Sequence, residues 1–270
     1  MVALVLAIVV LAGGFLVSAV WNNEPWDAYA EGWTELPLPP HTESSTTYVW
    51  AGSRLMSWGG GTRDGGDAHI AYTLDPKSKT WSPTAPAPLG GQIWAAIWTG
   101  SEVLYFVGEF PPGLQVLGFD PERNAWETFD PSPGGMTPPG SFTWTGRGVI
   151  VFGGSLDSNH SSEQAWWFDP ATGTWSPLPS SPIAMAAPAT AWSGQQLIAA
   201  GVTGDPPGSG SGSLETVAYD PGSSSWDVLP ASGLAADATG AVAVDGRPIL
   251  WQPAVASSVE WQPTSRSWTP

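Results

Sequence analysis

The chain has 270 residues, a net charge of −16 and no cysteine. With only eight Lys and Arg, it lacks the basic surface that phosphate binding requires, so nucleic acid is excluded as a partner. Because the chain has no cysteine thiol, disulfides, thiolate zinc sites and cysteine nucleophiles are also excluded. Its 33 Gly and 28 Pro suit an all-β fold with many turns, while 18 Trp and 8 Phe supply too much apolar surface for a disordered chain.

The first segment, Val2 to Val20, contains no charged residue and only one polar residue, Ser18. At helical rise, 19 residues span roughly 28 Å, which is close to the hydrocarbon thickness of a bilayer. Residues 1–20 therefore predict a hydrophobic helix. It is either an uncleaved transmembrane anchor or a secretory signal peptide ending near Ala19. Both alternatives place the rest of the chain outside the cytoplasm, anchored to the membrane or secreted, with 21–32 as a spacer.

From residue 33 onward, tryptophans recur at intervals of 42 to 51 residues, and an Asp-Pro pair stands six residues ahead of four of them. A fixed period near 50 residues indicates a repeat array, whose units bury their core by stacking on one another. We place the repeats at about 33–81, 82–126, 127–175, 176–226 and 227–270, ending at the periodic Trp or just beyond it.

Residues 141–179 carry the clearest repeat. Short apolar or aromatic runs alternate with a Gly turn, a polar loop and an Asp-Pro turn, which predicts a four-stranded antiparallel meander. The second run, 149–152, which precedes the Gly-Gly pair, and the third run, 165–168, which precedes the Asp, are apolar throughout. Such runs are typical of strands covered on both faces. The predicted strands are 141–144, 149–152, 165–168 and 175–179.

Each periodic tryptophan can bury about 150–250 Å², and we expect it to wedge between adjacent repeats. The Gly-Gly pairs mark close backbone approaches, and the Asp residues begin turns. The residues to which we assign these structural roles are Trp81, Trp126, Trp175, Trp226, Asp75, Asp120, Asp169, Asp220, Gly59, Gly60, Gly153 and Gly154.

This order of an apolar strand, Gly-Gly, an aromatic residue, Asp-Pro and Trp resembles the kelch repeat of the galactose oxidase and kelch-like superfamily. The resemblance covers roughly residues 33–270. Some copies depart from it, for example with Gly108-Glu109 in place of Gly-Gly. It implies an all-β, kelch-type β-propeller of about five four-stranded blades, monomeric, around a channel. Two possibilities stay open: 33–37 completes the last blade beside 259–261, or the chain is part of a longer ring.

The alternation of strand direction predicts that the longer connections share one end of the sheets, and binding in such scaffolds usually resides on long loops held by rigid strands. These are residues 61–69, 109–114, 155–164 and 202–213, with the linkers between repeats. As candidates for contact with a protein or glycan partner on this face we assign Arg63, Asp64, Asp67, His69, Glu109, Phe110, Asn159 and His160.

We expect no catalytic residue, cofactor or metal. The resemblance implies no oxidase, since a cysteine-modified tyrosine would be needed and the chain has no Cys. Asp64 and Asp67 are too few for a Ca²⁺ cage. The leading hypothesis is a non-catalytic propeller that binds a protein or glycan. The alternatives are a carbohydrate hydrolase or lyase with a site at the channel mouth, and a cell-envelope spacer.

Overall fold

The computed structural model describes residues 7–11, 14–18, 34–40, 46–59, 69–109, 113–155, 160–203, 212–235, 240–252 and 256–270. Within these ranges the chain is all β and contains no helix. Five four-stranded antiparallel sheets follow one another along the sequence, after one three-stranded sheet. The five predicted four-stranded meanders are thereby confirmed. The chain divides into two compact units, 1–131 and 132–270, which are described separately.

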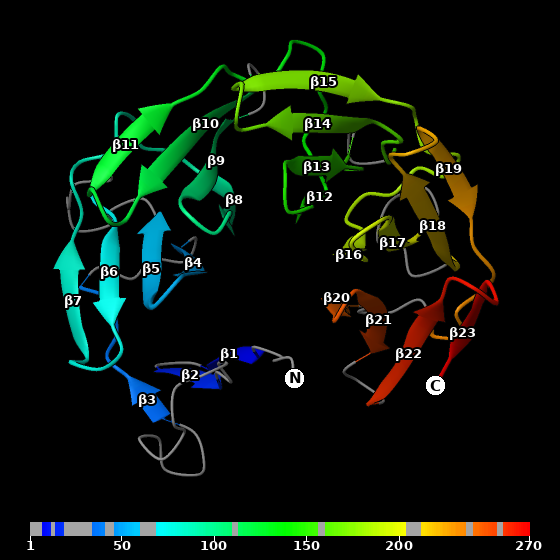
Figure 1. The fold of residues 1–270 in the computed structure, drawn as a ribbon, viewed down its shortest axis with the longest axis horizontal. Coiled ribbons are helices and arrows are strands. Elements are labelled where there is room, and N and C mark those ends of the chain that lie inside the picture. Colours follow the sequence, from blue (N-terminus) through cyan, green and yellow to red (C-terminus); the bar gives the residue numbers. More distant parts are fainter. Residues whose placement is uncertain are drawn as a thin grey trace. The chain divides into compact units, whose positions relative to one another are not determined.

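The first unit holds two four-stranded sheets in which each strand pairs with the next one along the chain (Figure 1). The first strands of the two sheets, β4 and β8, lie side by side. The strands are β4 (Thr46–Ala51), β5 (Arg54–Gly59), β6 (Tyr72–Asp75), β7 (Thr80–Pro83), β8 (Ile93–Trp98), β9 (Val103–Glu109), β10 (Gly113–Asp120) and β11 (Ala125–Thr128).

The second unit holds three such sheets, with β12 beside β16 and β16 beside β20. Its strands are β12 (Ser141–Trp144), β13 (Val149–Phe152), β14 (Ala165–Asp169), β15 (Thr174–Leu178), β16 (Ala189–Trp192), β17 (Leu197–Val202), β18 (Leu214–Asp220), β19 (Ser225–Val228), β20 (Gly240–Val244), β21 (Arg247–Gln252), β22 (Ser257–Gln262) and β23 (Ser267–Thr269).

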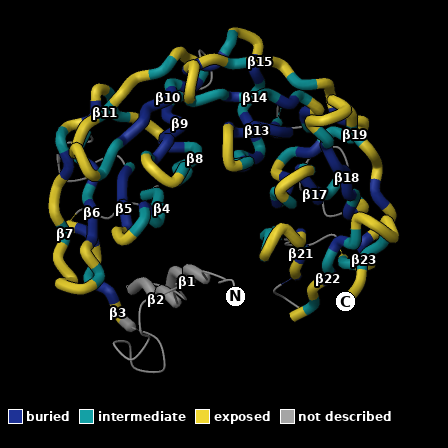
Figure 2. The backbone as a smooth tube through the Cα atoms, viewed as in Figure 1, coloured by how far each residue is buried: buried dark blue, intermediate teal, exposed yellow. Residues whose placement is uncertain are grey.

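Burial follows the order of strands within a sheet. All four residues of β13 are buried, as expected of an apolar run covered on both faces. The fourth strands β7, β11 and β19 are largely exposed (Figure 2). The apolar second strands therefore form the core, and the Pro-containing or polar fourth strands form the solvent-facing edge.

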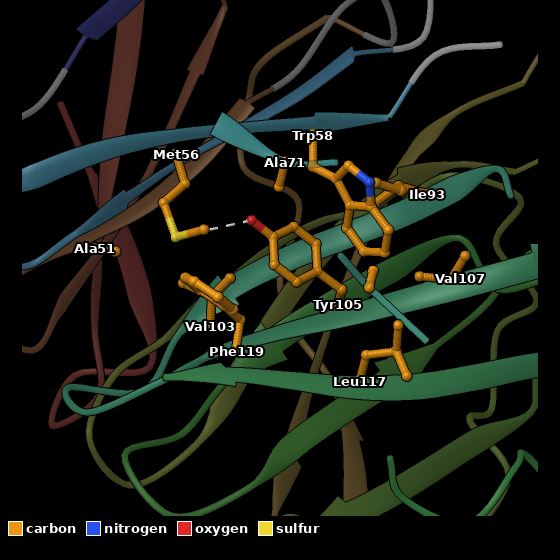
Figure 3. Close-up of a cluster of buried hydrophobic side chains, with 11 residues drawn as sticks. Ala51, Met56, Trp58, Ala71, Ile93, Val103, Tyr105, Val107, Leu117 and Phe119 are labelled. Atoms are coloured by element: carbon orange, nitrogen blue, oxygen red, sulfur yellow. Dashed lines mark hydrogen bonds between the residues drawn. The ribbon is translucent and has the colours of Figure 1, made fainter. Parts of the chain in front are cut away.

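Between the two sheets of the first unit lies a cluster of buried apolar side chains. Tyr105 is fully buried there, and its hydroxyl lies 4.0 Å from the sulfur of Met56 (Figure 3). Burial raises the pKa of Tyr105 far above its usual range. Trp58 packs edge-on against the Tyr105 ring, with ring centroids 4.8 Å apart.

The periodic tryptophans lie at the joints between sheets. Trp126 contacts Trp58 of the preceding sheet, with ring centroids 4.8 Å apart. Trp226 contacts Phe152 of its own preceding sheet at the same separation of 4.8 Å. In four cases the indole N–H also donates to a carbonyl in the segment just before the sheet: Trp81 to Pro37 at 2.8 Å, Trp126 to Ala85 at 2.8 Å, Trp226 to Pro179 at 2.7 Å and Trp268 to Pro230 at 2.9 Å.

The Asp residues that end the third strands cap the turns that follow, each through its side chain. Asp75 Oδ1 accepts a hydrogen bond from the backbone N–H of Lys77 at 2.8 Å, and Asp220 Oδ1 accepts one from Gly222 at 2.8 Å. This is the Asx-turn geometry that makes Asp suitable at the first position of a turn. The equivalent acceptors in the other sheets are Asp120 and Asp169.

The N-terminal segment differs from expectation. Residues 7–11 and 14–18, predicted as part of a helix, form strands β1 (Ala7–Leu11) and β2 (Gly14–Ser18), and β2 pairs with β3 (Thr34–Leu36). The predicted helix is therefore not confirmed. Among the described residues, no helix has the length and apolar character needed to cross a membrane. An all-apolar run satisfies a helix and a covered strand equally well, so its periodicity could not separate the two.

The fourth strand of the last sheet comes from its own repeat. Trp261 of β22 pairs with Trp268 of β23, whereas β3 pairs with β2. The possibility that 33–37 completes the last sheet beside 259–261 is therefore wrong for this structure.

Candidate partner-binding site

Each sheet has two ends that differ in their connections. The tight-turn end carries the short turns between the first and second strands and between the third and fourth strands. The long-connection end carries the connection between the second and third strands and the linker to the next sheet. The second-to-third connections are residues 60–71, 110–112, 153–164, 203–213 and 253–256. The sequence placed a long connection at 109–114, but only 110–112 separate β9 from β10.

In the third four-stranded sheet, β12–β15, the two ends of the connection 153–164 are paired with each other. We call this paired region the base of the connection. Ser155 and Ser161 form an antiparallel bridge, which closes the base around residues 156–160. The Gly154 carbonyl accepts a hydrogen bond from the N–H of Ser162 at 2.7 Å, and the Gly154 N–H donates to the Met185 carbonyl at 2.8 Å. The base is thus tied both to itself and to the following linker.

Gly153 and Gly154 are required by this close approach. Their φ angles are +71° and +114°, in the region that favours glycine. A Cβ on Gly153 would lie 2.6 Å from the Met185 carbonyl oxygen. A Cβ on Gly154 would overlap the Pro138 carbonyl oxygen. The Gly-Gly pair therefore lets two linkers and one connection meet at the end of β13.

A polar network around Gln164 fixes the other side of the same base. Gln164 Oε1 accepts from the N–H of Thr137 at 3.1 Å and from Trp166 Nε1 at 3.4 Å. Gln164 Nε2 donates to the Gly135 carbonyl at 3.3 Å. Thr137 Oγ1 donates to Ser162 Oγ at 3.0 Å. One amide side chain thus holds the incoming linker and the third strand in one arrangement.

In the first unit, His69 has the equivalent place at the end of the connection 60–71. Its carbonyl accepts from the N–H of Ala87 at 2.7 Å, as the Glu163 carbonyl accepts from Ser181 at 2.9 Å. His69 Nδ1 lies 2.9 Å from the Ala87 carbonyl oxygen. Because a carbonyl only accepts, Nδ1 carries the proton. The contacts assign His69 a positioning role at the base of the connection.

The fourth sheet closes its connection in the same way, at Thr203 and Ser213. The Thr203 N–H donates to the Ser213 carbonyl at 3.0 Å, and Thr203 Oγ1 lies 3.3 Å from the same oxygen. The connections 60–71, 153–164 and 203–213 therefore each have hydrogen bonds at their base. His69 bonds to a linker, Thr203 bonds to the other end of its own connection, and the base of 153–164 does both. Loops held by rigid strands in this way commonly carry binding residues.

Three of the predicted partner-contacting residues, His69, Glu109 and His160, lie within the described residues. His69 is half-buried against the linker, and His160 is exposed next to the bridging Ser161. Glu109 ends β9, where it pairs with Gly113. The others, Arg63, Asp64, Asp67, Phe110 and Asn159, lie outside the described residues. Gln164, Thr137 and Ser162 were not among the predictions, because their hydrogen bonds join positions distant in sequence and leave no local pattern.

The tight-turn end holds one notable electrostatic feature, at the second sheet. Burial raises the pKa of Glu102, and the nearby carboxylates of Glu127 and Asp120 raise it further. The Glu102 carboxylate lies over Gly118, where a Cβ would overlap it. In the part of the chain that the structure describes, no group of three or more His, Asp or Glu is placed to hold a metal ion.

Comparisons with known proteins agree with this architecture. Residues 138–182 match the model of the kelch motif, a range that contains the third sheet and the closed base of its connection. A solved structure, that of YjhT, is similar over 80% of this chain and 74% of its own, with a TM-score of 0.55 and 19% sequence identity. No curated protein matches the chain.

Proposed function

From the match of residues 138–182 to the kelch motif and the similarity of the fold to a solved structure over 80% of the chain, we propose that the protein is a non-catalytic scaffold that binds a protein partner through its long-connection ends. The observation that carries the proposal is that hydrogen bonds fix the base of three second-to-third connections, at Gln164, His69 and Thr203. In this proposal the rigid sheets fix the position of the connections, and the residues of the connections contact the partner.

Charge indicates the kind of partner. The second-to-third connections contain five acidic residues, Asp64, Asp67, Asp157, Glu163 and Asp205, and one basic residue, Arg63. The tight turns contain five basic residues, Lys77, Lys79, Arg123, Arg147 and Arg266, and three acidic ones, Glu102, Glu122 and Asp245. A partner with a basic surface is therefore favoured at the long-connection ends, and its binding weakens as salt rises.

The polar bases of the connections support binding. Their side chains are engaged with backbone and with one another, as expected of groups that fix geometry. The carbohydrate-active alternative would require carboxylates placed on both sides of a sugar bond. Among the described residues, the carboxyl group with a raised pKa is that of Glu102, which lies at the opposite, tight-turn end of its sheet.

Peptide display on the full chain tests the proposal. Peptides selected from a random library against the immobilised protein should be rich in Lys and Arg. Their binding should fall at least tenfold when 156–160 is replaced by Gly and Ser. The matched control replaces the tight turn 170–173 with Gly and Ser, which should leave binding unchanged. Binders that depend only on 170–173 would overturn the proposal, as would turnover of a glycoside by the unmodified protein.

A further inference from the structure

Strand β3 and the residue after it contact the first four-stranded sheet in the same way as the fourth strand of a sheet contacts the sheet that follows it. Residues 33–37, Trp-Thr-Glu-Leu-Pro, repeat the pattern of 175–179, Trp-Ser-Pro-Leu-Pro. Leu36 is buried against Leu55 and Leu74. The Pro37 carbonyl accepts the indole N–H of Trp81 at 2.8 Å, as the Pro179 carbonyl accepts that of Trp226. The segment thus makes the joint that a complete preceding blade would make.

The sequence before β3 also carries the repeat signature. Asp27 stands six residues ahead of Trp33, the spacing found before the other periodic tryptophans. The apolar run 2–12 ends in Gly13-Gly14, as β13 ends in Gly153-Gly154. From the second Gly to the Asp the distance is 13 residues here and 15 residues in the third sheet. The order and spacing of these markers are those of the other repeats.

The backbone pairing has the same strand order as the other repeats, but its strands lie elsewhere relative to these markers: β2 ends at Ser18, whereas β14 and β18 end at the Asp itself. β1, β2 and β3 form one antiparallel sheet in the order β1-β2-β3, with each strand beside the next one along the chain. The five four-stranded sheets have the same meander order. Strands that are apolar at every position, such as Ala7–Leu11, are typical of a sheet covered on both faces.

We infer that β1–β3 are an N-terminal blade of the same kind as the other five, and that the partner of the apolar segment 7–18 is the protein itself rather than a lipid bilayer. The inference does not depend on the proposed function. It replaces the anchor and signal-peptide expectations for these residues with a role in the fold, and it explains why Trp81 finds a carbonyl to bond, although its sheet is the first with four strands.

Engineered cysteines test this directly, because the chain has no cysteine of its own. Leu16 and Glu35 are paired across β2 and β3, and paired Cα atoms lie within the separation that a disulfide spans. The double variant Leu16→Cys, Glu35→Cys should cross-link under mild oxidation in the absence of lipid. The control Val10→Cys, Glu35→Cys places one thiol in β1, which is not adjacent to β3, and should not. Equal cross-linking of both variants, or of neither, would overturn the inference.

The unmodified full chain supplies a second measurement, in case the cysteine variants fold poorly. Elastase, which cleaves after small apolar residues, should leave residues 7–18 intact in buffer. The protein should not float with phosphatidylcholine vesicles. If elastase removes the segment in buffer and vesicles protect it, or if the full chain floats with the vesicles, lipid is the partner and the inference is wrong.

Discussion

Glycines at the two ends of the sheets meet different surroundings. At the tight-turn end, Gly100, Gly146 and Gly194 have positive φ, and a Cβ on any of them would meet nothing within 4 Å. At the long-connection end, a Cβ on Gly153 or Gly154 would collide with the backbone of a linker. The first three glycines are needed only for their local conformation, whereas the Gly-Gly pair is also needed for tertiary packing. Tolerance of substitution should therefore differ between these two sets of glycines.

The largest expected effect comes from alanine at matched glycines. Gly154→Ala combines a strained φ of +114° with a backbone overlap. It should lower the free energy of unfolding by on the order of 3 kcal/mol. Gly146→Ala has a comparable φ of +87° but open space, and should cost about 1 kcal/mol. Urea unfolding followed by tryptophan fluorescence measures both, and equal losses would show that the ends do not differ in packing.

A second pair compares glutamines. Gln164→Ala removes a side chain that bonds Thr137, Trp166 and Gly135, and should cost about 2 kcal/mol because several partners lose their bonds at once. Gln196→Ala at the tight-turn end removes one bond, to Asp220 at 3.4 Å, and should cost about 0.5 kcal/mol. Gln164→Ala should also reduce binding of the selected peptides. If Gln164→Ala lowers stability but leaves peptide binding unchanged, the base does not contribute to the surface that binds the peptides.

A smaller effect is expected at His69. His69→Leu keeps much of the side-chain volume but removes the bond to the Ala87 carbonyl, and should cost about 1 kcal/mol. Since the backbone bond from the Ala87 N–H to the His69 carbonyl remains, His69→Gln, with its own amide donor, should recover part of the loss. Thermal unfolding of the three proteins gives the comparison. If the glutamine variant is no better than the leucine variant, the bond contributes little.

The smallest effect concerns the pKa of Glu102, raised by burial and by Glu127 and Asp120. A carboxyl whose pKa is higher in the folded state destabilises that state as pH rises through this folded pKa. Glu102→Gln should therefore raise the melting temperature at pH 7. The advantage should vanish near about pH 3, where glutamate is protonated in folded and unfolded chains alike. A gain that persists at low pH would mean that packing, not ionisation, causes it.

Local sequence patterns predicted the strands well where glycine turns and Asp-Pro turns mark the strand ends. The predicted 141–144 and 149–152 coincide with β12 and β13. β14 extends one residue beyond its predicted end, and β15 is shifted by one residue at both ends. Glycine turns and Asp-Pro turns leave few alternatives for the chain between them. The helix predicted for residues 1–20 is not confirmed, and the apolar run could not separate helix from strand because it has no period. The bases of the long connections escaped prediction because Gln164 and Thr137 meet only in three dimensions.

The tryptophan hydrogen bonds have a consequence for engineering. Each bond runs from a repeat back to the segment before it, as from Trp226 to Pro179 and from Trp268 to Pro230. A graft that moved one blade alone would leave its indole without the acceptor to which it is fitted. The transferable cassette of this fold therefore begins with the outgoing proline stretch of one blade and ends at the tryptophan of the next.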